Sequence, residues 1–222
     1  MTGRGEAKVL PAEIPIFPLT GALLLPSGRL PLNIFEPRYV AMVEDALKGP
    51  RLIGMVQPED ENAEARMQDP SVYRVGCAGR ITLFRETRDR RFEIVLDGVS
   101  RFEIANQSET ASGYRVAEVA WERFAADLDA DIDTAVLEAA ERDKLVSALE
   151  RFLAARSANL KGTGIAELPD RELIAAIAMS CPFHPSEKQA LLEADSASDS
   201  AALLFSLLEM AAFEHDGRIS RQ

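Results

Sequence analysis

The stretch LPLNIFEPRY, residues 30–39, predicts a β-strand that runs directly into a helix. Leu30, Leu32 and Ile34 alternate with other residues, as in a strand with one buried face. Pro37 ends the strand and suits the first turn of a helix, where its missing N–H leaves no hydrogen bond unmade. Apolar residues at helical spacing follow Pro37 until a glycine stops the pattern. We therefore expect the chain to turn sharply from sheet to helix near its start.

Glu36 and Arg38 lie on either side of Pro37 at this corner. A carboxylate near a helix N-terminus is favoured by the helix dipole. A structural role is favoured for the pair, because the backbone groups of the corner need partners and an arginine can satisfy several carbonyl oxygens at once. A contact to a bound molecule is the alternative interpretation.

Closely spaced strands on both sides of this helix predict a curled, mostly antiparallel sheet. Gly76 and Gly79 inside one long strand indicate a bulge or bend that curls the sheet. Asp97-Gly98 is a strong signal for a tight turn between two strands. The expected strands span residues 13–19, 30–34, 52–56, 73–84, 91–96, 99–104 and 114–121.

After Trp121 the pattern changes from strands to helices. Trp121 is expected to fill the junction between the two parts. Apolar residues at helical spacing predict helices over residues 134–158 and 170–179. Two more helices are expected, one starting at a capping box of Ser186 and Gln189, the other capped by Asp199 or Ser200 and ending at Gly217.

The fold class that follows is α+β, with a curled sheet or pseudo-barrel, one inserted helix and a C-terminal helical bundle. We expect a β-rich lobe over residues 13–122 and a helical lobe over residues 132–217. An acidic, alanine-rich linker at residues 125–133 joins them. Residues 1–12 have the composition of a disordered lead-in, and residues 57–69 that of a mobile loop.

The formal charge of −11 argues against nucleic acid as the default partner, because phosphate binding needs a basic surface. The two cysteines, Cys77 and Cys181, fit free thiols in a reducing compartment. The start of the chain lacks the apolar core of a signal peptide. The longest early apolar run, residues 22–25, is far shorter than the roughly 20 residues of a membrane span. The expected location is the cytoplasm, without membrane contact.

The LPLNIFEPRY segment resembles the signature of the Lon protease N-terminal substrate-binding domain, and more distantly the N-terminal region of cereblon. Similar motifs follow at residues 75–77, 96–102 and 188–193, so the resemblance covers about residues 13–215. Asp89-Arg90-Arg91-Phe92 departs from the Asp-Gly hairpin common in that family. The resemblance implies a PUA-like barrel, and it marks as structural signature Pro31, Glu36, Pro37, Arg38, Gly76, Gly98, Arg101 and Phe102.

No catalytic residue and no cofactor are predicted. Gly162-Thr163-Gly164 has no following lysine, so it is not a phosphate-binding loop. Ser186 and Lys188 lie close in sequence, but the capping box explains them without nucleophilic chemistry. The ATPase and Ser–Lys proteolytic modules of a full Lon protease would not fit after residue 217. We therefore expect a protein that is not an enzyme.

No metal site is predicted either. Cys181 and His184 have the spacing of one ligand pair, with Cys77 and His215 as distant partners. A structural zinc site normally shows two close pairs. We expect Cys181 to pack in the bundle core and His184 to lie in a proline-rich turn.

The leading functional hypothesis is a protein- or peptide-binding module, because the resemblance implies recognition of exposed apolar segments of other proteins. Its site would be a groove between the lobes or an edge strand that accepts an extended peptide. A separate ATPase or protease is a candidate partner. The candidate binding residues are Leu30, Leu32, Ile34, Phe35 and Tyr39.

An RNA-binding module is the alternative, using an arginine-rich hairpin. Acidic residues interleave with these arginines, and no exposed aromatic ladder is expected beside them, although single-stranded binders usually need one. Nucleic acid is therefore the less favoured partner. The arginines are Arg80, Arg85, Arg88, Arg90, Arg91 and Arg101.

Overall fold

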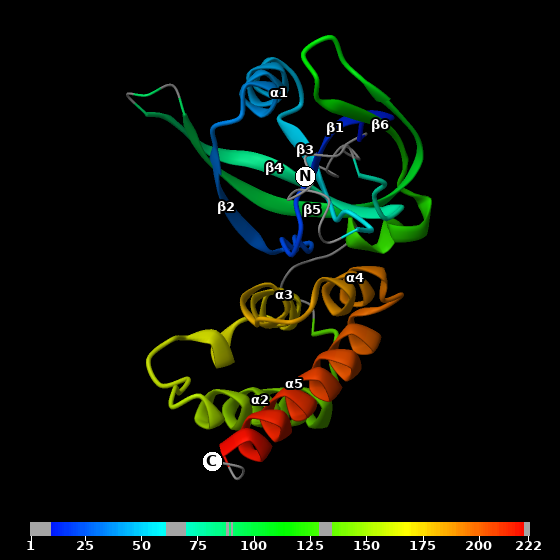
Figure 1. The fold of residues 1–222 in the computed structure, drawn as a ribbon. Helices are drawn as coiled ribbons and strands as arrows, with labels where there is room; N and C mark the ends of the chain where they lie inside the picture. Colours follow the sequence, from blue (N-terminus) through cyan, green and yellow to red (C-terminus); the bar gives the residue numbers. More distant parts are fainter. Residues whose placement is uncertain (1–9, 61–69, 88, 90, 129–134, 220–222) are drawn as a thin grey trace, which may run out of the picture.

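Six strands form one curled sheet in the β lobe, our name for residues 13–120 (Figure 1). The computed structural model describes residues 10–60, 70–87, 89, 91–128 and 135–219. The strands are β1 (Glu13–Pro18), β2 (Arg29–Ile34), β3 (Leu52–Val56), β4 (Val75–Glu86), β5 (Phe92–Glu109) and β6 (Arg115–Ala120).

The sheet closes on itself because β5 is long enough to pair with three strands. Its order is β2-β5-β4-β3-β1-β6, and β6 also pairs with the second half of β5. Every pairing is antiparallel except that of β1 with β3. Five strands thus form a barrel, while β2 extends from the first half of β5 as an edge strand. The predicted curled, mostly antiparallel sheet with an inserted helix is confirmed.

The predicted corner is also confirmed: β2 ends at Ile34, and α1 (Pro37–Lys48) begins at Pro37. One face of α1 buries Tyr39, Met42 and Val43 against the sheet, as the apolar spacing predicted. The helix is the crossover that lets β3 lie parallel to β1.

The tight turn predicted at Asp97-Gly98 is wrong, because both residues lie inside the continuous strand β5. The register shifts here: Ala78 pairs with Ser100 and Gly79 pairs with Gly98. A Cβ atom on Gly98 would lie 2.0 Å from the carbonyl oxygen of Leu25. The glycine is therefore required by a bulge and a close backbone approach, not by a hairpin.

Phe102 fills the interior of the barrel and is fully buried. A Cβ atom on Gly76 would lie 2.5 Å from its ring, and one on Gly54 would lie 2.7 Å from it. These glycines leave the space that the ring occupies. Gly76 and Phe102, two of the signature residues, thus form one packing unit.

Helices form the second part of the molecule, the helical lobe, our name for residues 139–219 (Figure 1). It contains α2 (Ala139–Ala155), a short 3₁₀ turn η2 (Ile165–Glu167), α3 (Asp170–Ser180), α4 (Pro185–Glu193) and α5 (Ala197–Ile219). A second 3₁₀ segment, η1 (Glu122–Asp127), connects β6 to this lobe. The helical bundle is confirmed, but α2 is shorter than the predicted 134–158.

Both predicted caps are displaced towards the N-terminus. His184 is the N-cap of α4, because Pro185 already occupies the first helical position, and the His184 N–H donates to Glu187 Oε2 (2.7 Å). At α5 the hydroxyl of Ser196 accepts the N–H of Asp199 (3.1 Å). The last helix also continues beyond Gly217 to Ile219.

Trp121 does not fill the junction between the lobes, contrary to the sequence expectation. It packs against Phe102, with ring centroids 5.8 Å apart, and its Nε1–H donates to the carbonyl of Pro11 (3.0 Å). Phe124 of η1 is buried instead, in a hydrophobic core that continues from the β lobe into the helical lobe. The 3₁₀ segment η1 carries this ring to the junction.

Three predictions lie partly outside the described residues: the lead-in over residues 1–9, the loop over residues 61–69 and the linker over residues 129–133. The division into domains at 13–122 and 132–217 stays a prediction.

Candidate functional site

A groove opens where β2 meets α1, and we name it the β2–α1 groove. It has a volume of about 600 Å³. Its walls come from four segments that are distant in sequence: the end of β1, the β2–α1 corner, Pro70 and the β5–β6 hairpin. The lining residues are Phe17, Pro18, Leu19, Leu32, Asn33, Phe35, Glu36, Arg38, Tyr39, Pro70, Glu109, Gly113, Tyr114 and Arg115.

Aromatic rings dominate the apolar part of the groove. The ring centroids of Phe17 and Tyr39 are 4.2 Å apart, and both side chains are buried. Phe35 is 63% exposed, although it follows a strand whose last residue is buried. Large exposed rings next to a cavity supply apolar area that a partner can cover. The groove can therefore accept apolar side chains.

The charged groups of the corner lie at the mouth of the groove. Nη2 of Arg38 lies 3.0 Å from Oε2 of Glu36, and the guanidinium stands over the ring of Tyr39, 4.6 Å from its centroid. Both side chains remain nearly half exposed. The structural role expected for Arg38 involved several backbone carbonyls, but the guanidinium contacts the Glu36 carboxylate and the Tyr39 ring.

Partly buried polar contacts hold the wall formed by the β5–β6 hairpin. The hydroxyl of Tyr114 donates to Asp45 Oδ2 (3.0 Å), so the hairpin is tied to α1. Hydrogen bonds from Lys48 and Tyr114 lower the pKa of Asp45, while burial raises the pKa of Tyr114. Arg115 donates to the carbonyl of Pro70 (2.7 Å) and to Gln107 Oε1 (3.2 Å). Hydrogen bonds thus tie this wall to α1 and to Pro70, whereas Glu36 and Arg38 at the corner are nearly half exposed.

The five candidate binding residues divide between this groove and the core. Leu32, Phe35 and Tyr39 line the groove. Leu30 is partly buried and packs against the larger hydrophobic core. Ile34 is 1% exposed, so it offers no surface to a partner. Leu30, Leu32 and Ile34 share the more buried face of β2, and Phe35 is exposed where the corner turns the chain out.

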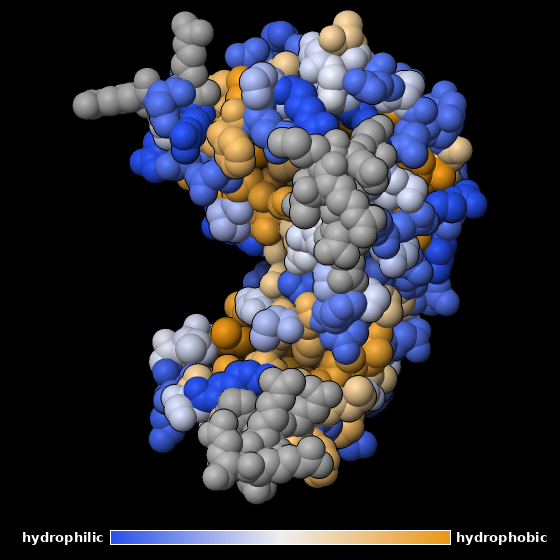
Figure 2. Space-filling model, in the orientation of Figure 1, coloured by the Kyte–Doolittle hydropathy of each residue, from blue (hydrophilic) through white to orange (hydrophobic). Residues whose placement is uncertain are grey.

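Strand β2 borders the groove and carries a single neighbour, β5, among the strands that the structure describes. Its outer edge therefore presents backbone groups to solvent. Pro31 lies on this strand and has no N–H to donate. Figure 2 shows apolar surface over β2, where the strand borders the hollow between the two lobes.

A family model for the substrate-binding domain of ATP-dependent protease La (Lon) matches residues 13–210. The chain belongs to this family. The Lon protease of Anaeromyxobacter dehalogenans is 29% identical over 98 residues, 43% of this chain and 11% of that protein. Lon protease 2 of Sorangium cellulosum is 27% identical over 135 residues, 59% of this chain and 16% of that protein. The chain thus matches a small part of the length of these relatives.

Two solved structures of Lon N-terminal domains share the fold. One is a Lon N-terminal domain protein from Xanthomonas campestris, with a TM-score of 0.62 and 23% identity over 87% of this chain and 97% of that one. The other is the N-terminal domain of a Lon protease from the Mycobacterium avium complex, with a TM-score of 0.62 and 14% identity over 88% and 97%.

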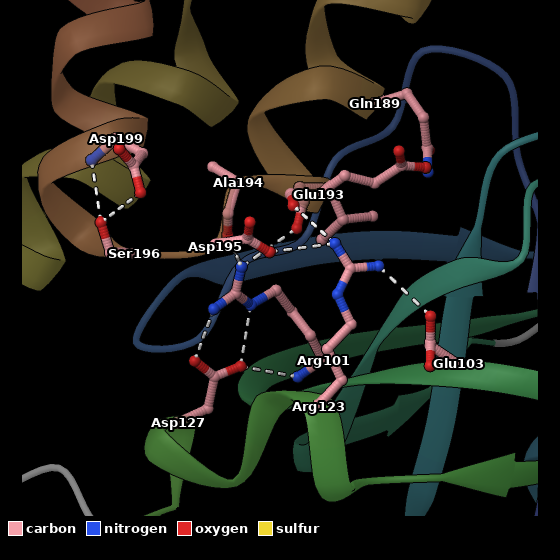
Figure 3. A network of polar contacts seen from close by, with 11 residues as sticks. Arg101, Glu103, Arg123, Asp127, Gln189, Glu193, Ala194, Asp195, Ser196 and Asp199 are labelled. Atoms are coloured by element: carbon pink, nitrogen blue, oxygen red, sulfur yellow. Dashed lines mark hydrogen bonds and ion pairs between the residues drawn. The ribbon is translucent and has the colours of Figure 1, made fainter.

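The charged residues of the Lon signature lie at two different places in the structure. Glu36, Arg38 and their neighbours form the mouth of the groove, whereas Arg101 lies at the junction of the lobes. Arg101 binds Asp127 through Nε (2.9 Å) and Nη2 (2.9 Å), and its Nη1 donates to the carbonyls of Leu192 and Ala194 (Figure 3). It thereby joins β5 to η1 and to the end of α4.

The second Lon-like segment, residues 188–193, lies on the other side of this junction. Lys188 donates to the carbonyl of Gly21 (2.8 Å), and Gln189 donates to the carbonyl of Val75 (3.2 Å). Burial lowers the pKa of Lys188. The motif that contains Arg101 and the motif at residues 188–193 are far apart in the sequence, and both hold the interface between the two lobes together.

The residues weighed for nucleophilic chemistry lie at the exposed start of α4. Ser186 Oγ is 2.9 Å from Nδ1 of His184, and Lys188 is directed to Gly21. The helix start accounts for these contacts. Cys181 is buried, and its pKa rises to about 11 because of burial. Within the described ranges, no group of three or more His, Cys, Asp and Glu side chains is placed to hold a metal ion.

Most arginines of the predicted basic strip have acidic or carbonyl partners. Arg85 pairs with Glu93, and Arg91 Nε lies 2.8 Å from Asp89 Oδ2. Arg80 donates to the carbonyl of Pro50 (2.7 Å). Arg88 and Arg90 lie outside the described residues.

Sequence reasoning missed Phe84, an exposed ring that follows Leu83 on β4. It also missed the groove residues from β1 and from the β5–β6 hairpin. The strand pattern indicated these segments, but only the pairing of β1 with β6 brings them to the corner. Among the described residues, no helix is both long and apolar enough to span a membrane.

Proposed function

We propose that this chain binds exposed, apolar, extended segments of other proteins in the β2–α1 groove and carries out no catalysis itself. Membership of the Lon substrate-binding domain family supports a substrate-binding module. The observation that carries the proposal is a 600 Å³ groove with exposed and buried aromatic rings directly beside an edge strand.

These two features match the two needs of an extended peptide. An edge strand supplies backbone hydrogen-bonding groups, and an adjacent pocket selects side chains. Burial of one large apolar side chain contributes roughly 1.5–3 kcal/mol. Pro31 removes one backbone donor, so the apolar groove supplies the larger part of the affinity.

Fluorescence anisotropy of a labelled, unstructured peptide rich in large apolar side chains tests this proposal. Phe35→Ser is expected to weaken binding at least tenfold, because it removes an exposed ring of the groove. The matched control is Phe213→Ser, which removes an exposed ring from α5. No binding by the wild type, or equal losses in the two variants, would contradict the proposal.

Two further assays address the alternatives. RNA binding predicts a gel shift at low salt that falls steeply as salt rises, but the pairing of Arg85 and Arg91 with acidic side chains disfavours it. Incubation with an unfolded protein is expected to yield no fragments above background. Crosslinking in cell extract tests whether a separate ATPase or protease is a partner.

A further inference from the structure

A small cavity lies where the two lobes meet, beside the N-terminus of α5. Its volume is about 60 Å³, several times the roughly 10–15 Å³ that one water molecule needs. Both lobes contribute to its walls. The lining residues are Leu25, Pro26, Arg101, Asp127, Arg171, Ile174, Ala175, Leu191, Ser196, Ala197 and Ser200.

Two polar groups at this cavity lack the partners that buried groups normally have. Ser200 is 6% exposed, and its Oγ has no hydrogen-bond partner in the described part of the chain. The Nε–H of Arg171 is buried and is equally unpartnered there. An unsatisfied buried polar group destabilises the folded state, so two at one cavity need an explanation.

The other charged groups around the cavity are already engaged. Both carboxylate oxygens of Asp127 accept from Arg101, whose remaining donor is directed to carbonyls of the α4 end (Figure 3). The carboxylate of Asp199, in the first turn of α5, accepts from the hydroxyl of Ser196 (2.6 Å). Arg171 is left as the cation of the cavity without a carboxylate partner among the residues described.

Backbone donors add to this positive character. Ala197 lines the cavity in the first turn of the 23-residue helix α5. The N–H of Asp199 donates to Ser196 Oγ and that of Ser200 to the carbonyl of Ser196, so the donors of this turn that remain for an anion are those of Ala197 and Ser198, which the helix dipole supports. Arg171 of α3 and Ala197 and Ser200 of α5 thus line one cavity from two helices.

We propose that this cavity binds one phosphate-sized oxyanion at the junction of the lobes. The Arg171 guanidinium supplies the charge and an N–H donor, Ser200 donates its hydroxyl, and Ala197 and Ser198 at the start of α5 donate backbone N–H groups. The bound anion thus joins α3 to the start of α5, in a cavity that the engaged Arg101–Asp127 pair also lines. This site is separate from the β2–α1 groove.

Thermal unfolding in rising inorganic phosphate, with ionic strength held constant by sodium chloride, tests the proposal on the full chain. The wild type is expected to show a saturable rise in Tm, because a ligand that binds only the folded state stabilises it. Arg171→Gln and Ser200→Ala are expected to weaken the apparent Kd at least tenfold. Arg151→Gln is the control, because it removes an exposed arginine that pairs with Glu209 on the far part of the bundle.

Ser200→Ala gives an additional sign test. Without phosphate its Tm is expected to equal or exceed that of the wild type, since the variant removes an unsatisfied hydroxyl; with phosphate the order reverses. A rise in Tm that does not saturate and is equal in all four proteins is the general effect of an excluded salt and overturns the proposal. Absence of any rise in the wild type also overturns it.

Discussion

The groove and the junction of the lobes are each built around an arginine stacked on an aromatic ring, but they differ in burial. The Arg38 guanidinium is 4.6 Å from the centroid of Tyr39 and its side chain is 45% exposed. The Arg101 guanidinium is 4.3 Å from the centroid of Phe124, and its side chain is 12% exposed.

Because of this difference in exposure, Arg38 is part of an accessible surface, whereas Arg101 is a structural link between the lobes. Arg101 has a bidentate carboxylate and two carbonyls, and its partner Asp127 is 4% exposed. A buried charge without these partners would be costly, so removing either member destabilises the fold. Arg38 has one exposed carboxylate partner, and such pairs contribute little to stability. The Glu36–Arg38 pair at the corner can therefore exchange solvent for a ligand, whereas the Arg101–Asp127 pair cannot.

The largest effect is expected for Arg101→Met. The change leaves Asp127 and two carbonyls at the end of α4 without their donor, so the free energy of unfolding should fall by about 3–5 kcal/mol. Urea denaturation followed by circular dichroism measures it. Arg101→Lys should recover only part, since lysine lacks the planar fork. The control Arg123→Met removes an exposed arginine of the same network; an equal loss in both would show that burial does not set the difference.

A pH effect of intermediate size is expected from Asp170. Burial raises its pKa, but the N–H groups of Leu137 and Val136 and the Arg142 guanidinium outweigh burial and lower it overall. The folded-state pKa is thus below the unfolded value, so this stabilisation is present above about pH 4 and lost as pH falls through the folded pKa.

Asp170→Asn tests this linkage. The variant should cost about 1–3 kcal/mol at pH 7, and its stability should fall less steeply than that of the wild type as the pH drops from about 5 to about 2. Unfolding free energies measured across this range decide the matter. Parallel curves for the two proteins would contradict the assignment.

The smallest effect is expected for Arg38→Met, which removes the more exposed of the two stacked arginines. The free energy of unfolding of this variant should change by about 0–1 kcal/mol. Its affinity for an apolar peptide should change, because Arg38 lines the groove. Denaturation and anisotropy on the same sample measure both quantities. A stability loss as large as that of Arg101→Met would remove the distinction between the two arginines.

The sequence predicted local structure well where one residue type has one physical consequence. Pro37 at the start of α1 and the alternation of β2 were read correctly, because a missing N–H and a period of two act locally. The tight turn predicted at Asp97-Gly98 was wrong because a glycine can be required either by a turn or by the close approach of another backbone segment. The carbonyl of Leu25, 73 residues before Gly98 in the chain, decided between them.

The candidate site was predictable only in part, for the same reason. Leu32, Phe35 and Tyr39 belong to the segment that the sequence singled out, whereas Phe17 and Tyr114 reach the groove because β6 pairs with both β1 and β5. Phe124 and not Trp121 lies at the junction, because η1 carries the ring of Phe124 there.

The sequence alone determined the family, the strand–corner–helix unit and the order of sheet and bundle, because hydrophobic periodicity and proline act through neighbouring residues. The tertiary structure decided which aromatic rings are exposed, which arginine is buried and where unpartnered donors meet at a cavity. These properties depend on segments far apart in the chain, and burial, which sets the energy of every charge and ring, exists only once those segments have packed together.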